Sequence, residues 1–184
     1  MTESDLLYGT TGKSAAANGG EPSWLGCSAY LAAVAGREDG APPPVDLVKE
    51  KRNGDFVRDM IKAGRVTAVH DVSDGGLIVA IAEMAMASGI GARLFEIPSW
   101  LEDPETANFE VFFDESQAQY VLTCAPGDFA AIDDEAYARG VSYFHIGETQ
   151  GSSLTVDEGM HITVAELKKA HDSWLPDYMA GKVQ

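Results

Sequence analysis

The chain has 184 residues, of which 45% are hydrophobic, and this composition suits one compact domain with a real core. Its formal net charge of -16 argues against nucleic-acid binding through a basic surface, because an acidic protein repels phosphate backbones. No apolar run reaches the length of a membrane span, and the acidic, polar start of the chain is unlike a signal peptide. We therefore expect a cytoplasmic protein that contacts neither membrane nor nucleic acid.

The first third of the chain is expected to lead from a flexible segment into two helices. Residues 1–22 are predicted to be flexible, because Gly, Ser, Ala and Thr dominate them after a short strand candidate at Leu6–Tyr8. Trp24–Ala35 and Leu47–Ala63 show the apolar spacing of helices, and Asp46 is placed to cap the second of them.

The stretch Val66–Ala87 organises the rest of the chain. A short buried, central strand is expected to begin at Val66, followed by a polar turn and an almost wholly apolar helix that starts near Gly75 or Gly76. Three side chains of the turn are suited to cap that helix: Asp71, Ser73 and Asp74. Only Glu83 is polar within the helix, so we expect neighbouring elements to cover it on nearly all sides.

The second half of the chain predicts mainly short strands. The expected strands are Ala92–Ile97, Asn108–Phe113, Gln119–Cys124, Ser142–Gly147, Ser153–Val156 and Met160–Thr163. Helices are expected at Gly127–Ala138 and at Val164–Trp174, the latter capped by Thr163 and ended by Pro176, with residues 177–184 as a loose tail. The whole chain, 1–184, is then a single α+β domain with a mixed or mostly antiparallel sheet covered by helices.

Two polar groups and two cysteines are the chemical candidates. In the first group, Asp71 and Asp74 could hold Mg²⁺ while His70 acts as an acid, a base or a phosphate partner. Alternatively, Asp71, Ser73 and Asp74 simply cap the buried helix, and His70 is satisfied by a hydrogen bond. The group Asp114-Glu115-Ser116-Gln117 either binds a polar ligand or is a polar connection between strands. Cys27 and Cys124 lie in apolar surroundings without metal-like spacing, which predicts two buried thiols.

The run from Ala68 to Ala87 resembles a motif of phosphoribosylformylglycinamidine synthase, the purine-pathway enzyme that makes formylglycinamidine ribonucleotide. Other stretches are similar to the same family: Leu25-Gly-Cys-Ser-Ala-Tyr-Leu31, Pro43-Pro-Val-Asp-Leu47, Asn53-Gly-Asp-Phe-Val57, Phe113-Asp-Glu-Ser-Gln117, Ile146-Gly147 followed by Leu154, and Trp174-Leu-Pro-Asp-Tyr-Met179. The synthase subunit is a fused tandem of two halves that look like aminoimidazole ribonucleotide synthetase, each with an N-terminal and a C-terminal domain. This chain resembles the last of those four domains.

The resemblance implies a place in the enzyme and no catalytic residue in this chain. The parent is an ATP-dependent ligase that uses Mg²⁺ and forms a C–N bond with ammonia from glutamine. Its catalytic histidines and ATP-contacting lysine lie in the first half. The matching residues here would line, at most, an auxiliary nucleotide or ligand site: His70, Asp71, Ser73, Asp74, Gly75, Gly76, Glu115, Ser116 and Gln117. Asp71 and Asp114 are the candidates for a metal.

The expected partners are the remaining domains of the same synthetase subunit and a glutaminase that supplies ammonia. On this view the chain alone is inactive and serves as a scaffold. ATP or ADP and Mg²⁺ are cofactors of the parent enzyme, and none is assigned to this chain itself. Two alternatives stay open. One is a non-catalytic interaction module, which is favoured by the apolar helix and by the uneven charge: residues 49–65 hold six Lys and Arg, whereas eleven Asp and Glu and no Lys or Arg lie between Arg93 and Arg139. The other is a domain of another ATP-dependent synthetase of the same superfamily.

Overall fold

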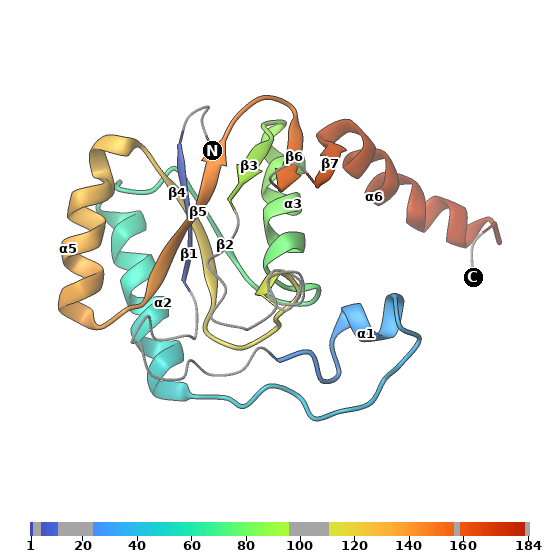
Figure 1. Cartoon of the computed structure of the whole chain (residues 1–184), viewed down its shortest axis with the longest axis horizontal. Helices are drawn as coiled ribbons and strands as arrows, with labels where there is room; N and C mark the ends of the chain where they lie inside the picture. Colours follow the sequence, from blue (N-terminus) through green and yellow to red (C-terminus); the bar gives the residue numbers. More distant parts are fainter. Residues whose placement is uncertain (2–4, 11–23, 96–110, 157–158, 183–184) are drawn as a thin grey trace.

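A computed structural model gives the fold and describes residues 1, 5–10, 24–95, 111–156 and 159–182. Within these residues one seven-stranded sheet has the order β2-β4-β1-β5-β3-β6-β7 (Figure 1). The strands are β1 (Leu6–Thr10), β2 (Ala68–Asp71), β3 (Ala92–Leu94), β4 (Tyr120–Cys124), β5 (Tyr143–Thr149), β6 (Ser153–Val156) and β7 (Met160–Thr163). The β3–β6 pair is parallel and the other pairs are antiparallel, which confirms the expected mixed, mostly antiparallel sheet.

Helices cover both faces of the sheet, and the alternation of side chains along β4 shows why. Helices α2 (Leu47–Lys62) and α5 (Phe129–Arg139) lie on one face, and α3 (Gly76–Ser88) lies on the other (Figure 1). Val121 packs into the apolar cluster of α3, whereas the next residue, Leu122, and Cys124 pack into the cluster of α2 and α5. Because successive side chains of a strand point to opposite faces, β4 feeds both halves of the core.

Two helices begin with the caps that their sequences predict. The Asp46 carboxylate accepts hydrogen bonds from the backbone N–H groups of Val48 and Lys49 at 2.9 and 3.1 Å, and the bond from Lys49 is the main reason why the pKa of Asp46 is lowered. Helix α6 (Val164–Met179) opens with a capping box, in which the Thr163 hydroxyl and the Glu166 carboxylate each bond the other's backbone N–H.

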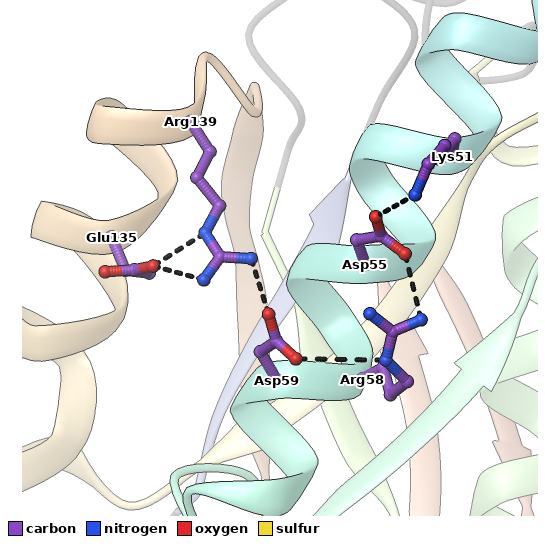
Figure 2. Close-up of polar contacts among 6 residues, drawn as sticks. All are labelled: Lys51, Asp55, Arg58, Asp59, Glu135 and Arg139. Carbon is purple, nitrogen blue, oxygen red and sulfur yellow. Dashed lines mark hydrogen bonds and ion pairs between the residues drawn. The ribbon is translucent and has the colours of Figure 1, made fainter.

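A chain of charged side chains joins α2 to α5 across their exposed faces (Figure 2). Arg139 of α5 pairs with Glu135 one turn earlier and donates to Asp59 of α2 at 2.8 Å. Arg58 contacts Asp59 at 3.8 Å, and Arg58 and Lys51 both pair with Asp55 (Figure 2). Each exposed ion pair of this kind contributes little to stability, so the packing of α2 on α5 depends mainly on the apolar cluster beneath them.

The expected helix at Trp24–Ala35 is wrong for most of its length. Only α1 (Ala29–Ala33) is helical, and the residues before it form a turn. Cys27 has a φ of 59°, in the left-handed region, which is incompatible with a continuous helix. The same turn leaves the Cys27 thiol exposed, so the prediction of two buried thiols is correct for Cys124 alone.

The expected buried, central strand at Val66 and the expected strand at Asn108–Phe113 are also corrected. Strand β2 begins at Ala68, is at most half-buried and forms one end of the sheet, since it pairs with β4 alone among the described residues. Val111 and Phe112 have helical backbone and Phe113 lies in a turn, while 108–110 lie outside the described residues. The Phe112 side chain is buried against α3. The apolar residues of this segment are therefore explained by tertiary packing, although their pattern resembles that of a strand.

The expected end of the last helix at Pro176 is wrong, because α6 continues to Met179. Proline removes one backbone hydrogen bond, and this helix tolerates the loss at an exposed position. The Trp174 and Tyr178 rings stack across the proline, with centroids 5.3 Å apart and planes inclined by 9°. Part of the expected loose tail is therefore helical. No helix among the described residues is long and apolar enough to cross a membrane.

The two thiols predict a simple test of this fold. At pH 8 one thiol per folded chain, that of Cys27, should react with Ellman's reagent within seconds to minutes. Cys124 is buried, and burial raises the pKa of its thiol to about 11, so it should react only after unfolding in urea. The Cys27→Ser variant should lose the fast phase and keep the second. Rapid reaction of both thiols in the folded chain would contradict the packing of β4.

The charge network in Figure 2 predicts a pH-dependent stability. The Arg139 guanidinium, through its hydrogen bond, holds the pKa of Asp59 below its usual value of 3.8. A folded-state pKa below the unfolded one adds stability above the unfolded pKa, and this stability is lost as the pH falls through the folded pKa. The Tm difference between wild type and Arg139→Met should therefore be largest near neutral pH and close toward about pH 3. Lys169→Met, which removes an exposed positive charge elsewhere, should show a Tm difference that does not close in this way; a pH-independent difference for Arg139→Met would count against the ion pair.

Candidate functional site

The two polar groups singled out in the sequence meet through one carboxylate. Glu115 Oε1 accepts hydrogen bonds from the backbone N–H of Gly75 at 2.7 Å and from that of Ala29 at 2.8 Å. Gly75 is the residue before α3, and Ala29 is the first residue of α1. A carboxylate next to the N-terminal N–H groups of a helix is stabilised by the helix dipole and by charge-assisted hydrogen bonds. Glu115 therefore joins the starts of two helices.

The turn before α3 needs both of its glycines. Gly75 and Gly76 have φ values of 86° and 73°, which L side chains rarely adopt. A Cβ on Gly76 would also lie 2.7 Å from the carbonyl carbon of Phe113, so the backbone before Asp114 packs directly on this turn. The close approach brings Glu115 within reach of the Gly75 N–H group.

Asp114 forms the buried centre of its loop. Its Oδ1 accepts hydrogen bonds from the Trp24 N–H at 2.8 Å, from the Ser116 N–H at 3.0 Å and from the Ser116 hydroxyl at 2.6 Å. Its Oδ2 accepts a bond from the Gln119 side-chain amide at 3.0 Å, and 7% of the residue is exposed. The bonds to both oxygens satisfy a carboxylate that would otherwise be costly to bury.

Helix α2 holds the far end of the same loop. Asn53, buried at 1% exposure, donates from its side-chain amide to the Ala118 carbonyl at 2.9 Å. Ala118 has a φ of 64°, so this bond and the ladder of β4 maintain a backbone conformation that alanine does not favour. Sequence reasoning missed Asn53, although a polar residue on the same helical face as Phe56 and Met60 was a visible signal.

The turn side chains do not act as the expected caps. Gly75 is the N-cap of α3 without a side-chain cap bond, and Asp71, Ser73 and Asp74 are exposed. The anion that the helix start needs comes from Glu115, forty positions along the chain. Local caps were a reasonable prediction, but the tertiary contact provides the acceptor instead.

His70 faces a different part of the molecule from Glu115. Its Nε2 lies 3.0 Å from the Glu83 carboxylate of α3, and its Nδ1 lies 2.6 Å from the Asp71 carbonyl oxygen. His70 and Glu83 line a groove of about 750 Å³ between β2, α3 and α6, which Glu115 does not line. The structure therefore separates His70, which stays beside Asp71, from Glu115 and the other predicted site residues.

The remaining candidates divide between two hollows. Asp74 and Glu115, with Glu38, line one of about 360 Å³ that has three carboxylates and no lysine or arginine in its wall. Ser116 and Gln117 line another of about 280 Å³, beside Trp24 and Lys49. Among the polar side chains of the Asp114–Gln117 loop, Gln117 is exposed.

The metal prediction fits the structure poorly. Within the described residues, no group of three or more His, Cys, Asp or Glu side chains is placed to hold a metal ion. Asp114 would have to give up its hydrogen bonds to coordinate one, and the Asp71 side chain is 72% exposed at the end of β2. We derive no chemistry through a metal at these two residues.

The sequence is similar to a known domain family and to known proteins. The family model described as "AIR synthase related protein, C-terminal domain" matches residues 3–157. Phosphoribosylformylglycinamidine synthase subunit PurL of Rhodopseudomonas palustris is 48% identical over 177 residues, which is 96% of this chain and 23% of that protein. The same subunit of Azorhizobium caulinodans is 48% identical over 174 residues, or 95% of this chain and 23% of the relative.

Solved structures share the fold at low identity. T. maritima PurL complexed with FGAR superposes with a TM-score of 0.70 at 17% identity, covering 91% of this chain and 28% of that one. Thiamine-monophosphate kinase from Stenotrophomonas maltophilia gives a TM-score of 0.53 at 16% identity, covering 85% and 51%. The chain thus spans about a quarter of the PurL relatives that it matches.

The Glu115 carboxylate predicts a measurable contribution to stability. Glu115→Ala should lower the free energy of unfolding by about 2–3 kcal/mol, because hydrogen bonds to charged groups contribute about 1.5–3 kcal/mol each and this side chain is half-buried. Glu115→Gln keeps one acceptor oxygen and should lose less. Gln117→Ala, in the same loop but exposed, should change the value by less than about 0.5 kcal/mol. Urea unfolding measures the free energy of unfolding of all three variants. Equal losses for Glu115→Ala and Gln117→Ala would contradict the structural role of Glu115 at the starts of α1 and α3.

Proposed function

Because the chain belongs to the AIR synthase related C-terminal domain family, we propose that it serves as one domain of a phosphoribosylformylglycinamidine synthase subunit. Identity of 48% over nearly the whole chain supports this parent over another synthetase of the superfamily, since the kinase above shares the fold alone. The parent would make formylglycinamidine ribonucleotide from formylglycinamide ribonucleotide, ATP and ammonia derived from glutamine, forming a C–N bond.

We propose further that this domain is a scaffold and not the catalytic domain. The observation that carries this is the Glu115 carboxylate, which accepts the N–H groups at the starts of α1 and α3. Helix starts that follow a glycine-rich turn are ready sites for phosphate groups. In this chain a side chain of the protein itself fills that position, and its negative charge would repel a phosphate there.

The auxiliary ligand site stays a prediction with two distinct places to test. The hollow beside Asp74 and Glu115 has an acidic wall, which disfavours an anionic nucleotide unless a cation accompanies it. The hollow beside Ser116 and Gln117 is lined by one lysine, Lys49, one carboxylate, Asp46, and Trp24, so it is less acidic and the better candidate for a nucleotide. Titration of the chain with ADP in the presence and absence of Mg²⁺, followed by Trp24→Phe and Gln117→Ala, assigns any binding to one hollow.

The partners that this function requires are the remaining domains of the subunit and a source of ammonia. One structural relative is described as "Structure of PurLQS from Thermotoga maritima". A scaffold domain must stay folded while it contacts those partners. The alternative of an interaction module is compatible with this role, and the exposed apolar residues at the end of α6 support such contacts.

The proposal predicts that activity requires the rest of the subunit. The isolated chain should hydrolyse ATP no faster than a blank in the presence of formylglycinamide ribonucleotide and ammonium. A chimera, in which this chain replaces the matching region of Rhodopseudomonas palustris PurL, should make product when ammonium is supplied. Substrate-dependent turnover by the isolated chain would overturn the scaffold role. A folded but inactive chimera would count against the synthase assignment.

A further inference from the structure

One face of α6 begins in the core and continues beyond it. Val164 is buried and Leu167 packs against the apolar cluster of α3. Residues three or four positions apart share a helix face, so the same face continues through His171, Trp174 or Leu175, and Tyr178. Figure 1 shows the helix running away from α3 and the sheet toward its C-terminal end. The face that packs on α3 therefore loses its support after about two turns.

The unsupported part of this face is strongly apolar. We call it the C-terminal face of α6, and its members are exposed by 58%, 59%, 52% and 77%: Trp174, Leu175, Tyr178 and Met179. Two of its side chains already stack on each other, which holds the rings in place. A contiguous exposed apolar face on a helix marks an interaction surface, whereas scattered apolar residues do not.

A groove lies against the same helix and continues the surface toward the sheet. It is the groove of about 750 Å³ named above, with α6 contributing Lys168, His171 and Asp172 to its wall. Methionine and alanine side chains of α3, among them Met84 and Met86, line its apolar wall. Methionine side chains adapt to different partners and are common at binding surfaces.

Strand β2 forms the third wall of this groove. It stands at one end of the sheet and pairs with β4 alone among the described residues, and Ala68, Val69 and His70 line the groove. The Val72 N–H donates to the Gln119 carbonyl of the neighbouring segment, and backbone groups of a strand alternate in direction. The Val69 N–H and C=O groups therefore point away from β4. An edge of this kind can pair with an added strand.

We propose that the groove and the C-terminal face of α6 together form the surface on which the rest of the synthase polypeptide docks. This inference rests on the proposed function. The chain spans 23% of its PurL relatives, so a much longer part of such a subunit would be attached to it. A tethered partner has an effective concentration on the order of millimolar, so a modest patch is enough to hold it.

A second copy of the chain fits this surface less well. Two copies each carry a net charge of -16 and repel one another. The occupant is thus an apolar segment of the same polypeptide, with backbone groups available to pair with β2.

Hydrogen exchange in the active chimera described above tests the docking. Peptides that contain β2 and the C-terminal half of α6 should exchange about tenfold more slowly in the chimera than in the isolated chain. Peptides of α5, on the other face of the sheet, should exchange equally in both. An active chimera with unchanged exchange at β2 and α6 would overturn the docking surface. Slowed exchange in an inactive chimera would support the surface and contradict the synthase assignment instead.

Matched variants separate docking from folding. Trp174→Glu with Tyr178→Glu should leave the Tm of the isolated chain within about 2 °C, because exposed side chains contribute little to its stability, and should abolish the slowed exchange in the chimera. The control is Tyr137→Glu on α5, whose side chain is 89% exposed and which should keep the slowed exchange.

Sedimentation of the isolated chain completes the test: a dimer that Trp174→Glu abolishes would make a second copy the occupant and overturn the proposal.

Discussion

The Glu115 carboxylate accepts two backbone N–H groups that begin different helices, and the positions of the surrounding segments depend on it. The residues involved are 86 and 40 positions away in the sequence. Its neighbour Asp114 holds the loop by accepting a hydrogen bond from the Trp24 N–H, and Asn53 of α2 holds it by donating one to the Ala118 carbonyl. Charge-assisted bonds of partly buried groups have strict geometry, so this loop connects the starts of α1 and α3 to α2.

The hydrogen bonds of Glu115 also bear on which ligands the start of α3 can bind. A helix start attracts an anion, and here the Glu115 carboxylate occupies that position, held by the N–H groups of Gly75 and Ala29. The Ser116 hydroxyl is likewise engaged, with Asp114, and so is less available to a ligand. A polar loop whose groups bond one another has fewer groups available to a ligand, and in this loop Gln117 stays exposed. The same residue types can therefore stand for a binding site in one domain and for a structural joint in another.

Local sequence signals predicted the elements that local physics determines. The caps at Asp46 and Thr163, the exact bounds of β6 and β7, and the fold class followed from propensity and periodicity. The errors lie where distant contacts decide: the turn at Cys27, the helical backbone at Val111 and Phe112, and the end strand β2. The Glu115 bonds could not be predicted from spacing, because no local pattern tells which of the eleven carboxylates between Arg93 and Arg139 reaches a helix start. The run of apolar residues in α3 was informative, since it correctly indicated a helix packed on several sides.

Two regions of the surface differ in a way that fits a domain within a larger subunit. On the face that α2 and α5 cover, a charge network lies over the apolar cluster. At the groove that β2, α3 and α6 line, β2 pairs with β4 alone among the described residues, and α6 carries its apolar face past the core. A domain that worked alone would gain from covering both, because open strand edges and apolar helix faces promote aggregation. The proposed docking of another part of the polypeptide would cover the groove and the apolar face together.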